Sequence, residues 1–347
     1  MADCSKELRD AAKTILGLYP AIESLEIPSL ISDNVTLSTM HGCPPDEIGK
    51  IAGYLMLEKR LHTTIKLNPT LLGPEELRGI LNDKLGFRTD VPDAAFEHDL
   101  KYPDAITLIR NLKEIADNER LEFGVKLTNT LESRNNRDVF APSESMMYMS
   151  GRSLHPISIT LAEKLQRDFS GALDISFSAG ADCFNIADIV SCGLSPVTIC
   201  SDLLKPGGYG RLSQILENLE IAMDRVSATG IDNFILNTAG KNTTTAPERK
   251  QTAMLMNLRD YAARVIDDPA YKKDPYASHD IKTNRPLGWF DCIHAPCVET
   301  CATHQDIPEY LRYVAAGDFT SAYKTITRTN PFPSVTGMIC DHLCQDK

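Results

Sequence analysis

Five cysteines near one end of this sequence have spacings that suit metal ligation. They are half of the ten in the chain: Cys292, Cys297, Cys301, Cys340 and Cys344. Their pattern is C-x4-C-x3-C, a gap of 38 residues, then C-x3-C. Thiolates at such short spacings hold iron–sulfur clusters, and the paired C-x2-C knuckles of zinc ribbons are absent. We therefore expect an iron–sulfur site, with zinc or buried free thiols as the alternatives.

A second set of useful side chains follows predicted strands. In parallel α/β folds the carboxyl ends of the strands carry the chemistry. A lysine there stabilises an anionic flavin ring, an asparagine bonds a ring edge, and small residues let a phosphate approach backbone N–H groups. We expect these residues to hold FMN. They are Lys66, Asn68, Lys126, Asn129, Ser150, Gly151, Gly180, Cys200 and Ser201. Tight turns and solvated lysines are the alternative interpretation.

Cys43 lies in the loop HGCPP after a predicted strand. A thiol at that position is a candidate acid that protonates a substrate carbon. The alternative is a buried cysteine that packs under Pro44 and Pro45. His41, two residues earlier, either tunes the thiol or caps the turn.

The composition excludes several classes of protein. The net charge of −11 and the isoelectric point near 5.3 argue against nucleic-acid and acidic-membrane partners. No run approaches the roughly 18 apolar residues of a membrane span, and the first residues lack the apolar core of a secretory signal. Ten cysteines without such a signal favour a reducing compartment. We expect a cytoplasmic protein.

Alternating apolar runs and amphipathic stretches predict a parallel α/β sheet. The predicted strands are Val35–Ser38, Thr64–Leu67, Phe87–Val91, Gly124–Thr128, Asp174–Ser178 and Pro196–Ser201. The predicted helices are Lys6–Leu18, Asp46–Lys59, Pro74–Leu81, Asp104–Asp117, Ile157–Asp168, Gly210–Val226 and Lys250–Ile266. Such a sheet is either doubly wound or closed as a barrel, and with six strands, two fewer than a closed (β/α)8 barrel needs, a barrel here would be incomplete. The domains are then a barrel over residues 1–235, a linker and helix over 236–288, and a small all-α module over 289–347.

The cysteine-rich module resembles a known family. FDCIHAPCVETC, the D-I-P that starts a helix, and N-P-F-P…T-G…C resemble the cluster domain shared by dihydropyrimidine dehydrogenase and the small subunit of glutamate synthase. The resemblance implies a helical domain with two [4Fe-4S] clusters. Cys292 and Cys297 would serve one cluster, and Cys301, Cys340 and Cys344 the other. The family has a further Cys where this chain has Trp289, and another beyond Lys347.

The barrel segments also resemble known proteins. VKLTNT, MSGRSLHPISITLAEKL, DISFSAGAD and VTICSDLLKPGGYG resemble the last units of the dihydroorotate dehydrogenase-like barrel. TLSTMHGCPPDEI, KLNPTLLG, MYMSGR and DCIHAPC extend the resemblance, so that residues 34–347 are similar to the selenate reductase iron–sulfur subunit family. That family continues into an FAD- and NAD(P)-binding domain. The resemblance thus implies a fragment that lacks the first barrel strands and everything after the cluster domain.

Two functions follow from these resemblances. The first is an iron–sulfur flavoprotein fragment that passes electrons from NAD(P)H, through FAD and the clusters, to a small substrate. The chemistry would resemble selenate reduction or pyrimidine reduction, with a molybdenum hydroxylase-type or other redox partner. The second is a non-catalytic electron-transfer or scaffold subunit whose barrel has lost its flavin. A zinc-binding interaction module is a third class.

Overall fold

The structure is a computed structural model. It describes residues 5–24, 32–39, 42–136, 140–141, 143–204, 208–240, 247–273, 296–299 and 301–340. The larger unit extends to residue 273, and a small helical module lies in residues 296–340.

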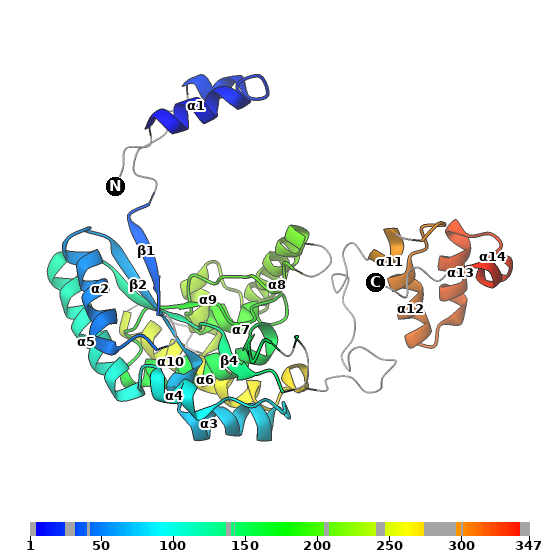
Figure 1. The fold of residues 1–347 in the computed structure, drawn as a ribbon. Coiled ribbons are helices and arrows are strands. Elements are labelled where there is room, and N and C mark those ends of the chain that lie inside the picture. The colour runs from blue at the N-terminus through cyan, green and yellow to red at the C-terminus, as the bar shows by residue number, and fades with distance from the viewer. Residues whose placement is uncertain are drawn as a thin grey trace.

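A parallel sheet forms the centre of the larger unit (Figure 1). Its strands, in spatial order, are β1 (Asn34–Ser38), β2 (His62–Leu67), β3 (Phe123–Leu127) and β6 (Ile175–Phe177). Four predicted strands are therefore confirmed, within a residue or two at their ends. Of the strand predicted at 196–201, only a parallel bridge from Phe177 to Val197 is present.

The two faces of the sheet differ in burial. Ile65, Leu67, Val125 and Leu127 are fully buried on the face that the helices cover. The alternate residues, among them Lys66 and Lys126, are half-buried on the inner face. A cavity of about 910 Å³ opens on the inner side of the sheet. The interior of a closed barrel is filled by side chains, so the described sheet is open, as the prediction of an incomplete barrel requires.

The larger unit contains helices that surround its sheet. In chain order the described ones are α1 (Ser5–Ile15), α2 (Pro45–Leu57), α3 (Pro74–Arg78), α4 (Asp93–His98), α5 (Tyr102–Glu119), α6 (His155–Asp168), α7 (Ile186–Ser191), α8 (Arg211–Arg225), α9 (Ile231–Thr238) and α10 (Pro247–Val265). Of these, α2 packs on β2, and α5 and α6 pack on β3. Short 3-10 helices are η1 (Pro20–Ser24), η2 (Pro69–Leu72), η4 (Gly151–Leu154), η5 (Gly208–Gly210) and η6 (Pro269–Tyr271), and a π-helix, η3 (Gly79–Lys84), continues α3. None of the described helices is long and apolar enough to cross a membrane.

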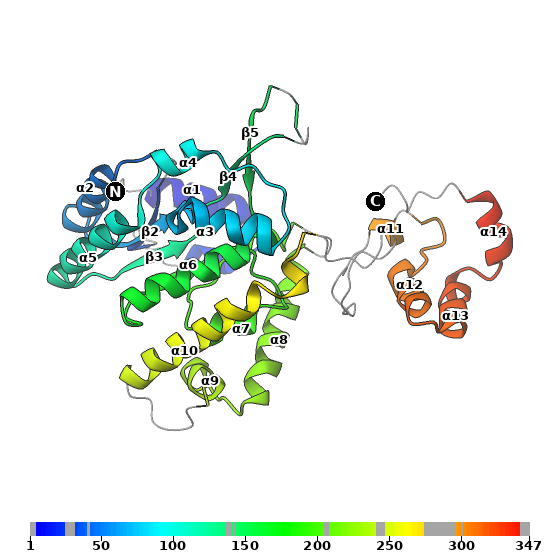
Figure 2. The same ribbon diagram turned by 90° about the horizontal axis from the view of Figure 1, so that it is seen from below.

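The helix α10 packs on the barrel core. It lies against α6 (Figure 2). Its buried residues Leu258, Tyr261 and Val265 join the same apolar cluster as the sheet residues. The domain boundary at residue 235 stays a prediction, but α10 itself contributes to the core of the larger unit.

The strand predicted at Phe87–Val91 is wrong. This segment has no regular structure. Apolar and polar residues do alternate there, but the segment pairs with no strand. The side-chain amide of Asn82 takes the place of a strand partner, because it bonds both the N–H and the carbonyl of Thr89. An antiparallel pair that was not predicted, β4 (Leu131–Arg134) with β5 (Met146–Met149), follows β3.

The module comprises α11 (Pro296–Glu299), α12 (Ile307–Ala315), α13 (Phe319–Thr329) and α14 (Pro333–Ile339). Asp306 caps α12 by accepting from the backbone N–H of Glu309, so the D-I-P motif starts a helix as predicted. Asp318 caps α13 in the same way through Ser321. The side chain of Gln305 donates to the Ile326 carbonyl and the Thr329 hydroxyl, and so joins the start of α12 to the end of α13.

Replacing Leu258 tests the contribution of α10 to the core. Leu258 is 1% exposed, so Leu258→Ala leaves a cavity and is expected to lower the free energy of unfolding by about 2–5 kcal/mol. Met256 on the same helix is 39% exposed, and Met256→Ala is expected to change it by about 0.5 kcal/mol or less. Urea unfolding of both variants measures the difference. Equal stabilities would show that α10 does not support the core.

Candidate functional site

The amide of Asn129 joins the carboxyl ends of three strands. Its Nδ2 donates to the Thr39 carbonyl at 2.8 Å and to Asn68 Oδ1 at 2.7 Å, with the Lys66 carbonyl at 3.3 Å. Its Oδ1 accepts from the Ser38 hydroxyl at 3.0 Å. Both N–H groups and the carbonyl are thus used within the protein. Asn129 therefore positions the strand ends around the site.

Asn68 is in a different state. It is 5% exposed, and its Oδ1 accepts from Asn129. Its Nδ2 donates no hydrogen bond to any described residue. This nitrogen is not fully enclosed by the protein, so a ligand can reach it. Of the two predicted asparagines, Asn68 keeps donors for a ligand.

Lys66 and Lys126 are register partners on β2 and β3, and their side chains lie on the same inner face. Lys126 Nζ donates to the Thr198 hydroxyl at 2.7 Å. Neither lysine forms an ion pair within the described residues. Burial, and then the positive charge of Lys66, lowers the pKa of Lys126. Two cations without a nearby counter-charge suit an anionic or electron-rich group.

Three loops of small residues, which contain Gly151, Gly180 and Ser201, approach one another closely. Gly151 and Gly180 both have positive φ, +73° and +65°. A Cβ on Gly180 would lie 2.5 Å from the Gly151 carbonyl oxygen, and one on Gly151 would lie 3.2 Å from Ser201 Oγ. Only glycine permits this approach. Ser150–Gly151, Gly180 and Cys200–Ser201 are therefore brought together, as the predicted phosphate site requires.

Ion pairs hold these loops in place. Arg152 donates to Asp182 at 2.9 Å, and Asp182 also accepts the Phe184 N–H at 2.9 Å. Arg211, at the start of α8, donates to both carboxylate oxygens of Asp202, at 3.0 and 3.2 Å, and both side chains are 2% exposed. Such a buried pair is costly to break, so the Ser201 loop is anchored to α8.

A buried histidine connects the Gly180 loop to α10. His155 Nδ1 lies 2.7 Å from the Ala179 carbonyl, which only accepts, so Nδ1 carries the proton. Nε2 then accepts from the Tyr261 hydroxyl at 2.6 Å. The His155 ring stacks on Tyr271 at 5.0 Å, and Asn185 Nδ2 bonds both the Tyr271 hydroxyl and the Gly180 carbonyl. Burial lowers the pKa of His155 to about 4.

No local sequence pattern predicts this network, because its members come from distant segments. His155 and Tyr261 are 106 residues apart. The only local signal is a histidine between apolar residues at a helix start, LHPI, which is also typical of a core histidine.

Cys43 is half-buried and packs against the barrel core. Burial, and then the carboxylates of Glu47 and Asp46, raise the pKa of its thiol. Its loop is held by Asp99, which accepts the Gly42 N–H at 3.1 Å and the Thr70 hydroxyl at 2.7 Å. A protonated thiol suits the predicted acid more than a nucleophile, and the role stays a prediction. His41 lies outside the described residues.

Three of the five predicted metal ligands lie in the described module. Cys297 and Cys301 are half-buried and Cys340 is exposed. The described residues contain no group of three or more potential metal ligands. Cys292 and Cys344 lie outside the described residues. The predicted set of five ligands therefore stays a prediction.

The surroundings of Cys301 fit a thiolate ligand. Burial alone raises the pKa of its thiol, but the Thr303 hydroxyl and the backbone N–H groups of residues 303–305 outweigh burial and lower that pKa. Hydrogen bonds to cysteine sulfur stabilise the thiolate form that ligates iron, and they help to set the reduction potential of an iron–sulfur cluster.

Both units match known protein families. Residues 2–251 match the family described as oxidoreductase YgfK, N-terminal TIM-barrel domain. Residues 277–347 match the family described as dihydropyrimidine dehydrogenase domain II, 4Fe-4S cluster. The predicted incomplete barrel followed by an iron–sulfur domain is confirmed at the level of fold class.

Individual relatives agree with these families. The chain is 42% identical to the inferred oxidoreductase YgfK of Escherichia coli (strain K12) over 335 residues, which are 95% of this chain and 30% of YgfK. It is 27% identical over 84 residues, 23% of the chain, to the beta subunit of an NADPH-Fe(3+) oxidoreductase of Geobacter sulfurreducens, and covers 12% of that subunit. The inferred oxidoreductase AegA of Escherichia coli is 37% identical over 54 residues, which are 15% of this chain and 8% of AegA.

The buried His155 predicts a loss of stability in acid. Its pKa is about 4 in the folded protein and 6.5 ordinarily, so the unfolded chain binds the extra proton first. The contribution of neutral His155 to the free energy of unfolding is fully present above about pH 6.5. It is lost as the pH falls towards 4, by about 3 kcal/mol in total. Urea unfolding at pH 7, 5.5 and 4.5 measures it.

The control for this pH effect is a histidine exchange. His155→Gln is expected to flatten the pH dependence between 6.5 and 4, whereas His98→Gln, at an exposed histidine, retains it. If the two variants and the wild type have the same slope, His155 is not the group responsible.

Proposed function

Because the chain belongs to the family of the oxidoreductase YgfK N-terminal TIM-barrel domain and also carries a 4Fe-4S domain, we propose that it transfers electrons between iron–sulfur clusters and a flavin in its barrel. The chain spans about 30% of the length of YgfK. The activity of a whole YgfK-like protein, with NAD(P)H and FAD as the electron source, is therefore part of the proposal.

One arrangement carries the flavin proposal. At one edge of the sheet, two lysines without a counter-charge lie in register, and three loops of small residues meet at close approach. Lys66 and Lys126 would face the electron-rich side of the ring, and Asn68 would donate to its edge. Ser150, Gly151, Gly180 and Ser201 would present backbone N–H groups and hydroxyls to the phosphate, with Cys200 beside them. The residues present therefore fit FMN.

The flavin would supply the redox chemistry when bound. The chain's own residues would orient and protonate. Asn129 holds the strand ends that carry Lys66 and Asn68, and the Cys43 thiol is kept protonated at neutral pH. Cys43 is the candidate donor of a proton to the substrate.

The substrate proposed is a small molecule reduced by selenate reductase-like or dihydropyrimidine dehydrogenase-like chemistry. The names of two relatives concern oxidoreductases, and one of them uses NADPH and Fe(3+). A molybdenum hydroxylase-type or other redox protein is the proposed partner. The cysteine content supports a reducing, cytoplasmic compartment.

A non-catalytic electron-transfer subunit is the second candidate. The observation that favours it is the cavity of about 910 Å³ on the inner side of the described sheet, which includes Lys126 in its lining. Solvent in this cavity would screen the charge of Lys126 and so weaken its attraction for a flavin. Flavin binding separates the two candidates.

Iron content tests the cluster domain. Anaerobic reconstitution of the full chain is expected to load iron and sulfide and to produce the broad absorbance of a [4Fe-4S] cluster. Cys301→Ser and Cys340→Ser, which remove predicted thiolate ligands, are expected to lose at least about half of that iron. Cys4→Ser, at the other end of the chain, is the control. Near-zero iron in the wild-type chain would contradict an autonomous cluster domain.

FMN binding tests the barrel. The full chain is expected to quench FMN fluorescence, and Lys126→Met to weaken binding by about tenfold because it removes a charge-assisted contact. Lys50→Met, at an exposed lysine of α2, is the control. The wild-type midpoint potential of bound FMN is expected to lie above that of Lys126→Met, since a cation stabilises the reduced ring. Absence of FMN binding would support the second candidate.

A further inference from the structure

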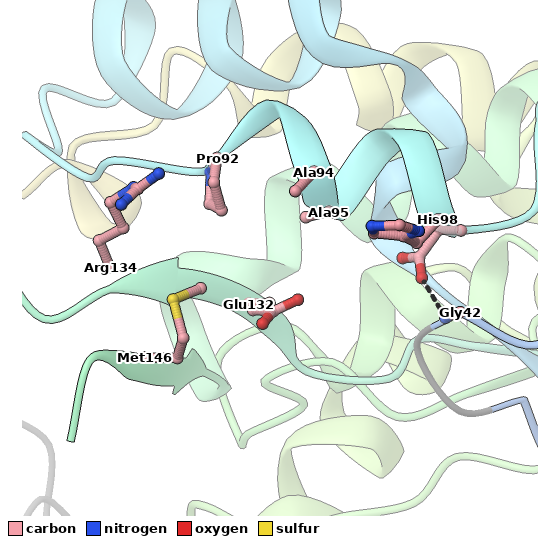
Figure 3. Close-up of a pocket in the computed structure, with 9 residues that line it drawn as sticks. Gly42, Pro92, Ala94, Ala95, His98, Glu132, Arg134 and Met146 are labelled. Atoms are coloured by element: carbon pink, nitrogen blue, oxygen red, sulfur yellow. Dashed lines mark hydrogen bonds between the residues drawn. The ribbon is translucent and has the colours of Figure 1, made fainter. Parts of the chain in front are cut away.

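A cleft of about 370 Å³ separates α4 from the β4–β5 hairpin (Figure 3). Its lining contains neither the lysine pair nor the glycine loops of the proposed flavin site. A volume of this size suits a small organic molecule. The cleft is therefore a second candidate site of the larger unit.

Glu132 extends into the middle of this cleft (Figure 3). Its side chain is half-buried, and it forms no hydrogen bond or ion pair with any described residue. The other carboxylate of the lining, Asp99, is used, because its two oxygens accept from Gly42 and Thr70. Glu132 thus offers both oxygens to a ligand.

The neighbouring cation does not neutralise Glu132. Arg134 lies two residues further along β4, on the same face of the strand. Its Nε is paired with the Asp90 carboxylate at 3.3 Å, and its backbone N–H donates to the Asp90 carbonyl at 2.8 Å. Arg134 is thereby held at the Pro92 end of the cleft, apart from Glu132 (Figure 3).

Apolar side chains lie on both sides of the cleft. Pro92 and Ala95 are buried on the α4 side, and the half-buried Met146 lies opposite them on β5. Such walls accept a flat apolar group, while one carboxylate with two accepting oxygens matches two parallel N–H donors. His98 and Arg134 also line the cleft, so the preference for a planar cation over a carboxylate or a phosphate rests on the two unused oxygens of Glu132.

We propose that this cleft binds a small planar organic cation of the amidinium or guanidinium class, which donates two N–H bonds to Glu132 and places its apolar part between Ala95 and Met146. Binding does not involve the flavin, so the site goes beyond the proposed function and is tested separately.

Two probes of the same shape and opposite charge test this proposal. Calorimetric titration of the flavin-free full chain is expected to show saturable binding of benzamidine and none of benzoate. Glu132→Gln keeps the size of the side chain but removes its charge, and is expected to weaken benzamidine binding by about tenfold or more. Glu97→Gln, at an exposed carboxylate of α4 outside the cleft lining, is expected to bind as the wild type does.

Three results would overturn the proposal. The first is stronger binding of benzoate than of benzamidine, which would assign the site to Arg134. The second is equal binding of benzamidine by Glu132→Gln and by the wild type. The third is that the wild type binds no benzamidine. Circular dichroism of Glu132→Gln checks that the variant is folded. Because all arms use flavin-free protein, failure here leaves the flavin proposal unaffected, and failure of FMN to bind leaves this one unaffected.

Discussion

The side chain of Asn129 is the interaction on which the candidate site depends. A parallel sheet aligns the carboxyl ends of its strands, but the backbone ladder ends there and leaves the last carbonyls without partners. Asn129 satisfies the Thr39 carbonyl, fixes Asn68 and accepts from Ser38, so one amide joins the ends of β1, β2 and β3. With those ends fixed, the register places Lys66 beside Lys126 and leaves the donors of Asn68 available.

The other half of the site depends on contacts from much later in the chain. The Gly180 loop is held by Asn185 and by the neutral ring of His155, which in turn bonds Tyr261 of α10. A buried polar network of this kind is stable only when each member has its partners. The loops that would approach a phosphate are thus positioned by α10 and η6, although neither contributes a residue to the proposed flavin site.

The two units of the chain reach their structures by different routes. The module around Cys301 is built from short-range contacts, with Asp306 and Asp318 capping successive helices. The barrel unit depends on pairings between distant strands. The two units match different families, a YgfK-type TIM-barrel domain and a 4Fe-4S cluster domain. The cleft at Glu132 belongs to the barrel unit as well, and its lining is separate from the lysine pair and the glycine loops.

The sequence by itself determined the fold class, four strands of the sheet and the iron–sulfur domain. Strand periodicity, helix caps and cysteine spacing are local properties that survive without tertiary contacts. The same local reasoning failed at Phe87–Val91, where the alternation is present but the side chain of Asn82 occupies the backbone that a strand partner would need. It also missed α4, α7, α9 and the β4–β5 pair, which are short and obtain their stability from packing.

Only the tertiary structure decided which asparagine keeps its hydrogen-bond donors for a ligand. It also decided that His155 is neutral and holds the Gly180 loop, and that Glu132 has no partner among the described residues. Each depends on segments that are distant in sequence, and no local pattern records which of them meet.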